Sequence, residues 1–177
     1  MEHLLTTLSK LMAEQKLPAL LIGGHAVTVM GYPRATFDID LLIPRESAEP
    51  WKKALGNFHY KVFSESKNFL QLESASELPL PPLDLMLVEQ DVFNTLQADQ
   101  TDHQPIPTPS PEAMVALKLH AINQPARENT AKDWSDIFAI MSAQNLSLDD
   151  PDFAAIIQKH GGEEAAQKIS DHFKNGR

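Results

Sequence analysis

The chain has 177 residues, a length that fits one compact domain with room for a small helical appendage. Its apolar share of 42% and charged share of 22% are those of a soluble globular protein, and the lack of cysteine excludes disulfides and thiolate metal sites. With a net charge of −9 the chain has no general electrostatic attraction for nucleic acid, so any contact with RNA must be local or must use a metal ion.

The first part of the chain alternates between predicted helices and strands. Residues 2–15 space their leucines at helical intervals, which predicts an amphipathic helix rather than a signal peptide. No apolar run is long enough to span a bilayer, so we expect a cytoplasmic location and no membrane partner. The later elements expected here are a strand at 19–22, a short helix at 25–30, a strand at 36–43, a helix at 46–56, a strand pair at 58–63 and 68–73, a loop at 74–82, a strand at 83–88, a helix at 91–96 and an exposed connector at 99–111.

The remainder of the chain is predicted to be helical. Ser110 is a suitable N-cap, and Pro111 and Glu112 suit the first turn of the helix that follows it. The expected fold class is therefore α+β, with a mixed sheet flanked by helices in residues 1–108 and a helical subdomain packed on it in residues 109–177. The helices expected there cover 110–123, 131–144, 151–160 and 162–174.

Two aspartates on one predicted strand are the central chemical signal. Side chains alternate along a strand, so Asp38 and Asp40 face one side about 7 Å apart, while Phe37, Ile39 and Leu41 face the other side as core candidates. Two like charges beside a buried strand repel each other, and a bound divalent cation such as Mg²⁺ removes that cost. The alternative is an exposed strand end with two solvated acids, and D-x-D also occurs in sugar-nucleotide transferases.

A third carboxylate heads a later apolar strand. Asp84 is the lone acid of residues 83–88, where burial would be costly without a partner. If this strand lies beside the one that carries Asp38 and Asp40, the three carboxylates can hold two Mg²⁺ ions, one for a triphosphate and one for an attacking hydroxyl. The alternative is that Asp84 sits at a solvated strand end.

Two further features favour phosphate binding near these acids. Gly23 and Gly24 lie between a predicted strand and a helix start, where glycine lets backbone N–H groups approach a phosphate. Arg34 precedes the aspartates, and its planar guanidinium can clamp a phosphate. The alternatives are a tight turn for the glycine pair and a surface ion pair for the arginine.

Together these motifs, within roughly residues 18–88, resemble the DNA polymerase β-like nucleotidyltransferase superfamily. The resemblance is closest to the minimal bacterial branch that includes the AbiEii-type toxin nucleotidyltransferases, for which G-x-x-R-x-T-x-D-x-D is typical. The residues that carry the resemblance are Gly23-Gly24-His25-Ala26-Val27, Gly31, Arg34, Thr36, Asp38-Ile39-Asp40 and Leu83-Asp84-Leu85, and the segment from Gly31 to Asp40 matches the branch motif in full.

The resemblance implies a mixed-sheet nucleotidyltransferase core, Mg²⁺, an NTP donor, and transfer of a nucleoside monophosphate to a hydroxyl or phosphate acceptor. It implies that Asp38 and Asp40 hold metal and triphosphate, and that Asp84 completes the second metal site and helps to activate the acceptor. Many relatives have serine in place of Gly24, which can offer only its backbone. The residues that it assigns to the nucleotide are Gly23, Gly24, Arg34, Thr36 and Lys118.

The helical half contributes the last of these residues. Lys118 is the one charged residue of an otherwise apolar predicted helix, and similar family members place a basic residue of this region near the phosphates; the alternative is a lysine that reaches solvent. Asp133 and Asp136 share a helix face in a K-D-x-x-D segment that similar members also carry. Asp133 or Lys132 is expected to line the cleft or to order Lys118 and Arg127, with a structural salt-bridge network as the equal alternative.

Three functions remain open at this stage. The first is a Mg²⁺-dependent nucleotidyltransferase with tRNA or a protein as acceptor, acting as the toxin of a toxin–antitoxin pair with an antitoxin partner. The second is a catalytically silent nucleotide-binding or partner-binding domain of the same fold. The third is a glycosyltransferase that uses D-x-D, which the short length and the glycine pair disfavour. His25 and His120 are assigned no catalytic role.

Overall fold

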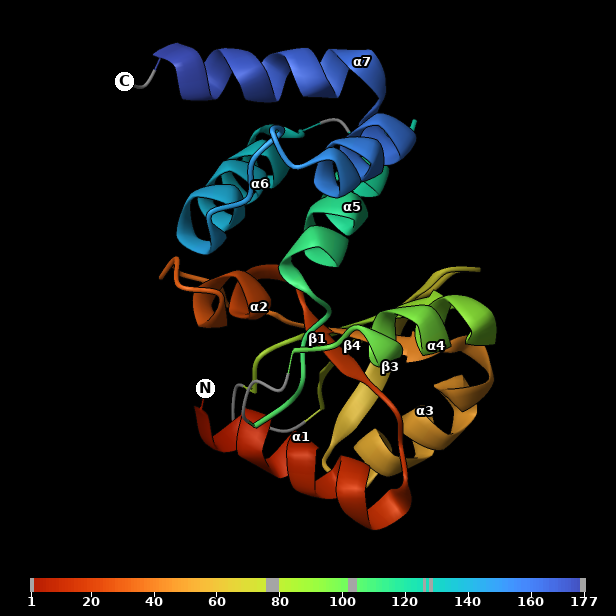
Figure 1. The fold of residues 1–177 in the computed structure, drawn as a ribbon. Helices are drawn as coiled ribbons and strands as arrows, with labels where there is room; N and C mark the ends of the chain where they lie inside the picture. The colour runs from red at the N-terminus through yellow and green to blue at the C-terminus, as the bar shows by residue number, and fades with distance from the viewer. Residues whose placement is uncertain (1, 76–79, 102–104, 126, 128, 176–177) are drawn as a thin grey trace. The chain divides into compact units, whose positions relative to one another are not determined.

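The structure is a computed structural model that describes residues 2–75, 80–101, 105–125, 127 and 129–175. The chain divides into two compact units, drawn together in Figure 1. The first unit comprises Met1–Ala26 and Arg34–Pro109, and the second comprises Val27–Pro33 and Ser110–Arg177.

A five-stranded mixed sheet forms the centre of the first unit. Its strands are ordered β1-β2-β5-β4-β3, with β2 and β5 parallel and the other neighbouring pairs antiparallel. Because β5 lies directly beside β2, two segments that are far apart in the sequence form the middle of the sheet. The strands are β1 (Leu20–Ile22), β2 (Ile39–Pro44), β3 (Tyr60–Glu65), β4 (Phe69–Ser74) and β5 (Leu83–Val88).

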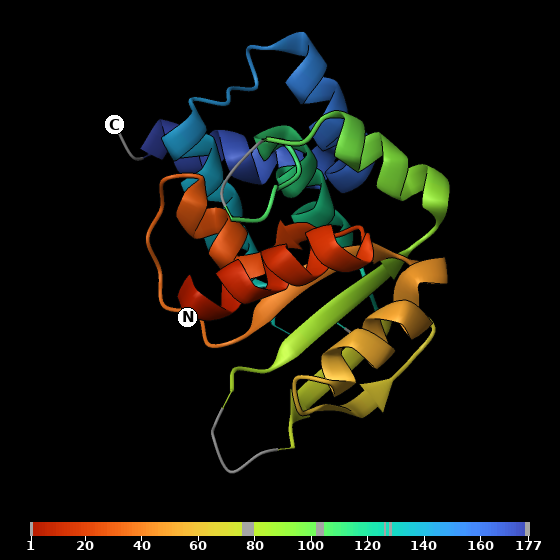
Figure 2. The same cartoon turned by 90° about the horizontal axis from the view of Figure 1, so that it is seen from below.

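Helices α1 (Glu2–Gln15) and α3 (Ala48–Gly56) lie on one side of this sheet, and Figure 2 shows both in front of it. Trp51 of α3 is fully buried, and its indole Nε1 donates a hydrogen bond to the carbonyl oxygen of Pro18 at 3.2 Å. Asp40 and Asp84 alternate with the buried residues of their strands, so their side chains lie on the other face. The buried residues of the central strands include Ile39, Leu41, Ile43, Leu70, Leu72, Leu83, Leu85 and Leu87.

The second unit is helical. The hydroxyl of Ser110 accepts a hydrogen bond from the Ala113 N–H at 3.2 Å, which confirms the predicted N-cap. The predicted break near residue 161 occurs at Gly162, whose φ of 71° interrupts the last helix. No helix within the described ranges combines the length and the apolar character needed to cross a bilayer. The helices are α5 (Pro111–Ile122), α6 (Ala131–Gln144) and α7 (Pro151–Asn175), and α2 (Gly23–Val29) crosses the boundary between the units.

The strand that was predicted to carry both aspartates begins later, so Asp40 lies on it and Asp38 precedes it. Residues 36–43 were expected to be extended, but β2 starts at Ile39, and Phe37 is 82% exposed rather than part of the core. The Thr36 hydroxyl donates to the Asp38 carboxylate at 2.7 Å, a local bond that competes with strand pairing. Because Phe37 precedes the sheet ladder, the alternation that predicted its burial does not apply to it.

The other elements differ from the prediction mainly at their ends, and the α+β prediction is confirmed. The expected strand pair occurs as β3 and β4, displaced by one or two residues, and the helix expected over 46–56 is preceded by a short 3₁₀ turn, η1 (Arg45–Ser47). The connector contributes an isolated bridge between Thr101 and Thr108. The remaining element of the first unit is α4 (Gln90–Ala98), and parts of the expected loop and connector, 76–79 and 102–104, lie outside the described residues.

Candidate active site

Asp38, Asp40 and Asp84 come together at one end of the central strands. One carboxylate oxygen of each lies within 4.8 Å of the corresponding oxygens of the other two, and all three residues are half-buried. Asp40 and Asp84 are direct partners in the register of the parallel β2–β5 pair. The predicted convergence of the three acids therefore follows from strand pairing, with Asp38 joining them from the segment just before β2.

Two neighbouring side chains orient these carboxylates. Thr36 donates its hydroxyl hydrogen to Oδ1 of Asp38 at 2.7 Å. Gln71, which pairs with Asp84 across β4 and β5, donates from Nε2 to Oδ1 of Asp84 at 3.3 Å. Gln71 was not among the sequence candidates, because its role depends on the β4–β5 register, which no local pattern specifies.

The electrostatics of the three acids favour a bound cation. Burial raises the pKa of Asp84 above its ordinary value, the Gln71 hydrogen bond opposes this, and the charge of Asp38 raises it further. A divalent cation that binds the three carboxylates offsets both the burial and the repulsion. The donors are all carboxylate oxygens, the ligand type that suits Mg²⁺ better than softer metals.

Gly23 lies against Asp40. Its φ is +64°, and a Cβ built on it would stand 1.9 Å from Oδ2 of Asp40. Any side chain at this position would therefore face both an unfavourable backbone conformation and a carboxylate in the same space. The turn between β1 and α2 requires glycine here for a reason connected directly to the acidic site.

Gly24 is buried and lies against the other two predicted nucleotide-binding residues of this unit. A Cβ at this position would come 2.6 Å from Nη2 of Arg34 and 2.7 Å from the Thr36 hydroxyl oxygen. The space that a serine side chain would need is thus occupied by the guanidinium and the hydroxyl. The structure therefore gives a steric reason for glycine at this position.

His25 also belongs to this neighbourhood. Burial lowers the pKa of His25 and the charge of Arg34 acts in the same direction, while the charge of Asp38 opposes them. The imidazole is therefore neutral near pH 7. Its Nε2 is buried and has no hydrogen-bond partner among the described residues.

The charged residues of the helical unit form an ion-pair network. Nζ of Lys118 lies 3.1 Å from Oδ1 of Asp133 and 2.7 Å from Oδ2 of Asp136, and both aspartate side chains are only 1% exposed. Nη2 of Arg127 lies 2.6 Å from Oδ2 of Asp133, while Lys132 is exposed. The structure therefore shows Asp133 paired with both Lys118 and Arg127, as expected from the sequence. The assignment of Lys118 to a nucleotide stays a prediction.

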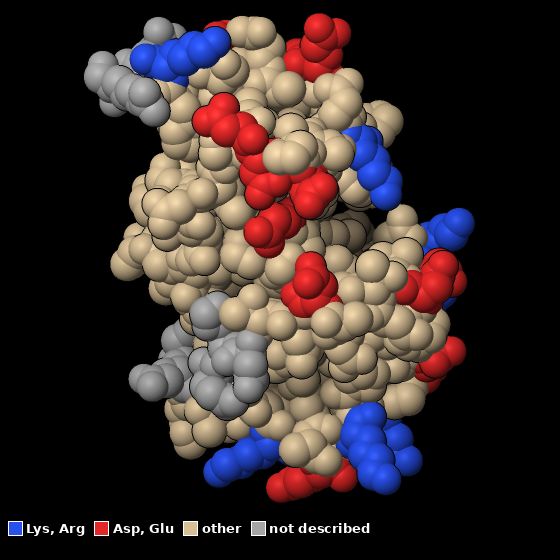
Figure 3. All heavy atoms as spheres, in the orientation of Figure 1, with Lys and Arg blue, Asp and Glu red and all other residues tan. Residues whose placement is uncertain are grey.

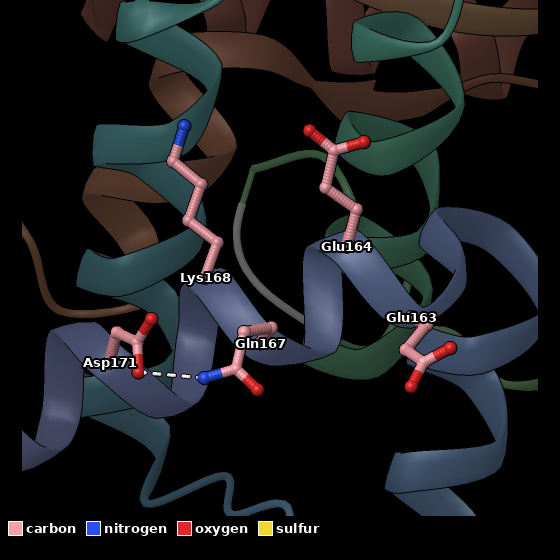
Figure 4. Close-up of a pocket in the computed structure, with 5 residues that line it drawn as sticks. All are labelled: Glu163, Glu164, Gln167, Lys168 and Asp171. Atoms are coloured by element: carbon pink, nitrogen blue, oxygen red, sulfur yellow. Dashed lines mark hydrogen bonds between the residues drawn. The ribbon is translucent and has the colours of Figure 1, made fainter.

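The hollow in Figure 4 lies on α7 within the helical unit. Its volume is about 570 Å³, and none of the predicted site residues lines it. Nε2 of Gln167 donates to Asp171 at 2.8 Å, and Nζ of Lys168 lies 4.2 Å from the centre of the Trp134 ring. Three of the lining side chains thus make local contacts, and the full lining is Glu163, Glu164, Gln167, Lys168 and Asp171.

Solved structures show that this fold is the one that nucleotidyltransferases use. The antibiotic-resistance factor ANT(2″)-Ia aligns over 98% of this chain and 100% of its own, with 17% identity and a TM-score of 0.66. The lincosamide antibiotic adenylyltransferase LnuA, solved with bound lincomycin, aligns over 81% of this chain and 98% of its own, with 21% identity and a TM-score of 0.59. An antigenic nucleotidyltransferase-like protein from Paracoccidioides brasiliensis aligns over 89% of this chain and 91% of its own, with 17% identity and a TM-score of 0.55. The chain therefore has a nucleotidyltransferase-like fold.

The chain belongs to the AbiEii family, described as the nucleotidyl transferase AbiEii toxin of type IV toxin–antitoxin systems, whose profile matches residues 57–176. The resemblance stated from the sequence is therefore confirmed. The matched segment contains Asp84 and Lys118 but begins after Asp40, so the β2–β5 pairing is what joins the first two aspartates to it. Comparison with curated proteins gave no match.

Gly23→Ala is expected to destabilise the first unit. The left-handed backbone costs about 1–2 kcal/mol for a residue with a Cβ, and the contact with Asp40 adds to this. Thermal unfolding should show the loss. The matched control is Gly56→Ala, because no atom lies within 4 Å of a Cβ built there. Equal melting temperatures for the two variants would contradict the steric argument.

Asp84→Asn is expected to raise the melting temperature at pH 7 without divalent ions. The pKa of Asp84 is higher in the folded protein than in the unfolded protein. Ionisation of its carboxyl therefore costs no stability below the unfolded pKa, costs more as the pH rises to the folded pKa, and keeps its full cost at higher pH. Each kcal/mol relieved corresponds to about 2–4 °C in a chain of this size.

Thermal scans between pH 4 and pH 8 check this prediction, and the gain should shrink toward pH 4. Glu14→Gln, at an exposed position of α1, is the control and should change little. Added Mg²⁺ should raise the melting temperature of the wild type and not that of Asp84→Asn. A lower melting temperature for Asp84→Asn at pH 7 would reject the repulsion argument.

Lys118→Met is expected to destabilise the helical unit by about 3–5 kcal/mol, because it removes the cation beside buried Asp136 and leaves buried Asp133 paired with Arg127. Chemical denaturation measures the change. Lys132→Met, at an exposed position of the same network segment, is the control and should fall within about 0.5 kcal/mol of the wild type. A similarly small effect at Lys118 would show that the network adds nothing to stability.

Proposed function

We propose that the protein is a cytoplasmic Mg²⁺-dependent nucleotidyltransferase that moves a nucleoside monophosphate from an NTP to a hydroxyl or phosphate acceptor. The observation that carries the proposal is the convergence of three carboxylates beside the Gly23-Gly24 turn. In keeping with the family, the protein would act as the toxin of a toxin–antitoxin pair, with an antitoxin as partner and with tRNA or a protein as acceptor.

Asp38, Asp40 and Asp84 would hold the metal, with room in the arrangement for two ions. Bound Mg²⁺ would neutralise the triphosphate and lower the pKa of the acceptor hydroxyl. The residues of the chain perform the remaining tasks of binding and orientation. Thr36 fixes the rotamer of Asp38 and Gln71 fixes that of Asp84, so both carboxylates are oriented before a substrate arrives.

The phosphates would lie at the turn between β1 and α2. The Asp40 carboxylate fills the space beside Gly23 and the Thr36 hydroxyl lies beside Gly24, so a phosphate at this turn would meet these groups rather than the glycine backbone. Arg34 lies against Gly24, where its guanidinium can pair with a phosphate oxygen. Gly23 contacts Asp40, and Gly24 contacts Arg34 and Thr36, whose hydroxyl is bonded to Asp38. The triphosphate would therefore be held in a fixed position relative to the metal.

The charge of the protein suits a nucleotide that arrives with its own cation. On the face drawn in Figure 3, acidic side chains gather together, whereas the described Lys and Arg residues are scattered. The formal net charge is −9. A Mg²⁺–NTP complex carries less negative charge than the free nucleotide and is therefore repelled less by such a surface.

Incubation with labelled NTPs, Mg²⁺ and cell extract is expected to label an acceptor. ATP is the first donor to test, because LnuA is named an adenylyltransferase. Asp40→Ala should abolish the labelling because it removes a metal ligand. Glu14→Ala, at an exposed position of α1, is the matched acidic control and should label at the wild-type rate.

Persistent labelling by Asp40→Ala would reject the proposed metal role. Nucleotide binding by calorimetry without transfer to any fraction of the extract would favour the silent-domain alternative. Transfer from a nucleotide sugar instead of an NTP would favour the glycosyltransferase alternative.

A further inference from the structure

The parallel pair of β2 and β5 carries charged residues at both of its ends. Asp40 and Asp84 are the second residues of the two strands, and they are direct partners in the register. The same register runs to the last residues of both strands, and Arg45 and Glu89 follow directly. Two like charges therefore meet near one end of the strand pair, and two opposite charges meet at the other.

The apolar pattern of these strands excludes a shift of one residue between them but not a shift of two. Side chains alternate between faces with a period of two, so a two-residue shift keeps every apolar side chain on its face. Such a shift would separate Asp40 from Asp84 and relieve the repulsion between like charges that lie opposite each other. An interaction that distinguishes the two registers is therefore needed to hold the aspartates together. The buried side chains that recur at every second position are Ile39, Leu41, Ile43, Leu83, Leu85 and Leu87.

The guanidinium of Arg45 makes that distinction. Its Nε donates to Oε1 of Glu89 at 2.8 Å, which joins the end of β2 to the end of β5. Its Nη2 donates to Oδ1 of Asn68 at 3.2 Å, and its Nη1 donates to the carbonyl oxygen of Lys67. A shift of β5 by two residues would carry Glu89 about 7 Å along the strand direction and break the ion pair.

The contacts of Arg45 with the turn before β4 extend the same control to Gln71. Asn68 lies in the turn between β3 and β4, and its carbonyl oxygen accepts a hydrogen bond from the Leu87 N–H at 2.8 Å. The start of β4 is thereby fixed against the end of β5. Three residues after Asn68, Gln71 donates to the carboxylate of Asp84.

We propose that Arg45 and Glu89 form a register clamp for the β2–β5 pair, an inference that rests on the proposed function. The clamp keeps Asp40 opposite Asp84 and keeps Gln71 within reach of Asp84, so that the carboxylates are aligned for a bound cation. Arg45 lies at the opposite end of the strands from these acids and is therefore a positioning residue. The attraction at one end of the pair offsets the repulsion at the other, and the paired strands between them transmit the alignment.

The clamp acts on alignment more than on overall stability. The side chain of Glu89 is 67% exposed, and ion pairs at such positions contribute little to the free energy of unfolding. Two registers that bury the same apolar side chains differ little in hydrophobic energy, so a small electrostatic preference is enough to decide between them. The acidic site should therefore respond to the loss of Arg45 in a way that a general loss of stability does not explain.

Mn²⁺ binding to the full chain, followed by electron paramagnetic resonance, tests the alignment of the acids, because Mn²⁺ suits the same carboxylate and water ligands as Mg²⁺. Arg45→Met is expected to weaken Mn²⁺ binding about 10-fold, as loss of a residue that orients metal ligands does. Arg45→Lys should give an intermediate affinity, since a lysine can pair with Glu89 but lacks the planar fork that serves three acceptors. Lys52→Met is the control and should bind Mn²⁺ as the wild type does, because Lys52 pairs with Glu49 and Glu65, where it joins α3 to β3.

A second measurement reads the register itself without a metal ion. In the wild type, NOEs between Leu41 and Leu85 and between Gln71 and Asp84 should follow the observed strand pairing. Arg45→Met should weaken these NOEs or shift them by two residues. Addition of Asp84→Asn to Arg45→Met should restore the NOEs between Leu41 and Leu85, because the like charges no longer oppose the native register.

The results separate the register clamp from the proposed function. If Asp40→Ala still transfers nucleotide, or if the wild type binds no Mn²⁺, the proposed function fails and the NOEs alone decide on the clamp. If Arg45→Met keeps both the NOEs and the Mn²⁺ affinity of the wild type, as Lys52→Met should, the clamp alone is overturned. If Arg45→Met does not fold, Arg45→Lys provides the same comparison. Weaker Mn²⁺ binding together with altered NOEs that Asp84→Asn restores supports the clamp.

Discussion

The parallel pairing of β2 with β5 is the constraint on which the site depends. It sets Asp40 against Asp84 and leaves the two charges half-buried at the centre of a sheet. An apolar layer beneath, built from alternate residues of the same strands and covered by α1 and α3, holds the two strands in register. The same hydrophobic pattern therefore stabilises the fold and concentrates three carboxylates in a group that could hold a metal ion, at a cost to the stability of the protein without one.

Much of this arrangement could be predicted from local patterns. The apolar runs of β2 and β5, the glycine pair and the cap at Ser110 each reflect short-range physics, and these elements appear close to where they were expected. The error at Phe37 has the same origin, because strand periodicity was extended over residues that a Thr36–Asp38 hydrogen bond holds outside the ladder. Periodicity identifies strands better than it locates their ends.

What could not be predicted depends on contacts between distant segments. Gln71 is an ordinary polar residue in the sequence and becomes a partner of Asp84 only through the order of β4 and β5. In the helical unit, the sequence left open whether Asp133 and Asp136 serve a cleft or each other. In the structure both aspartates pair with Lys118, because two carboxylates that are only 1% exposed require a cation beside them.

The contact of Gly24 with Arg34 and Thr36 couples the residue choices at these three positions. A serine at position 24 would have to displace the guanidinium or the hydroxyl that now fills its space. A larger residue at position 24 could therefore be accommodated only together with a change at Arg34 or Thr36, so these three positions can be replaced only as a set.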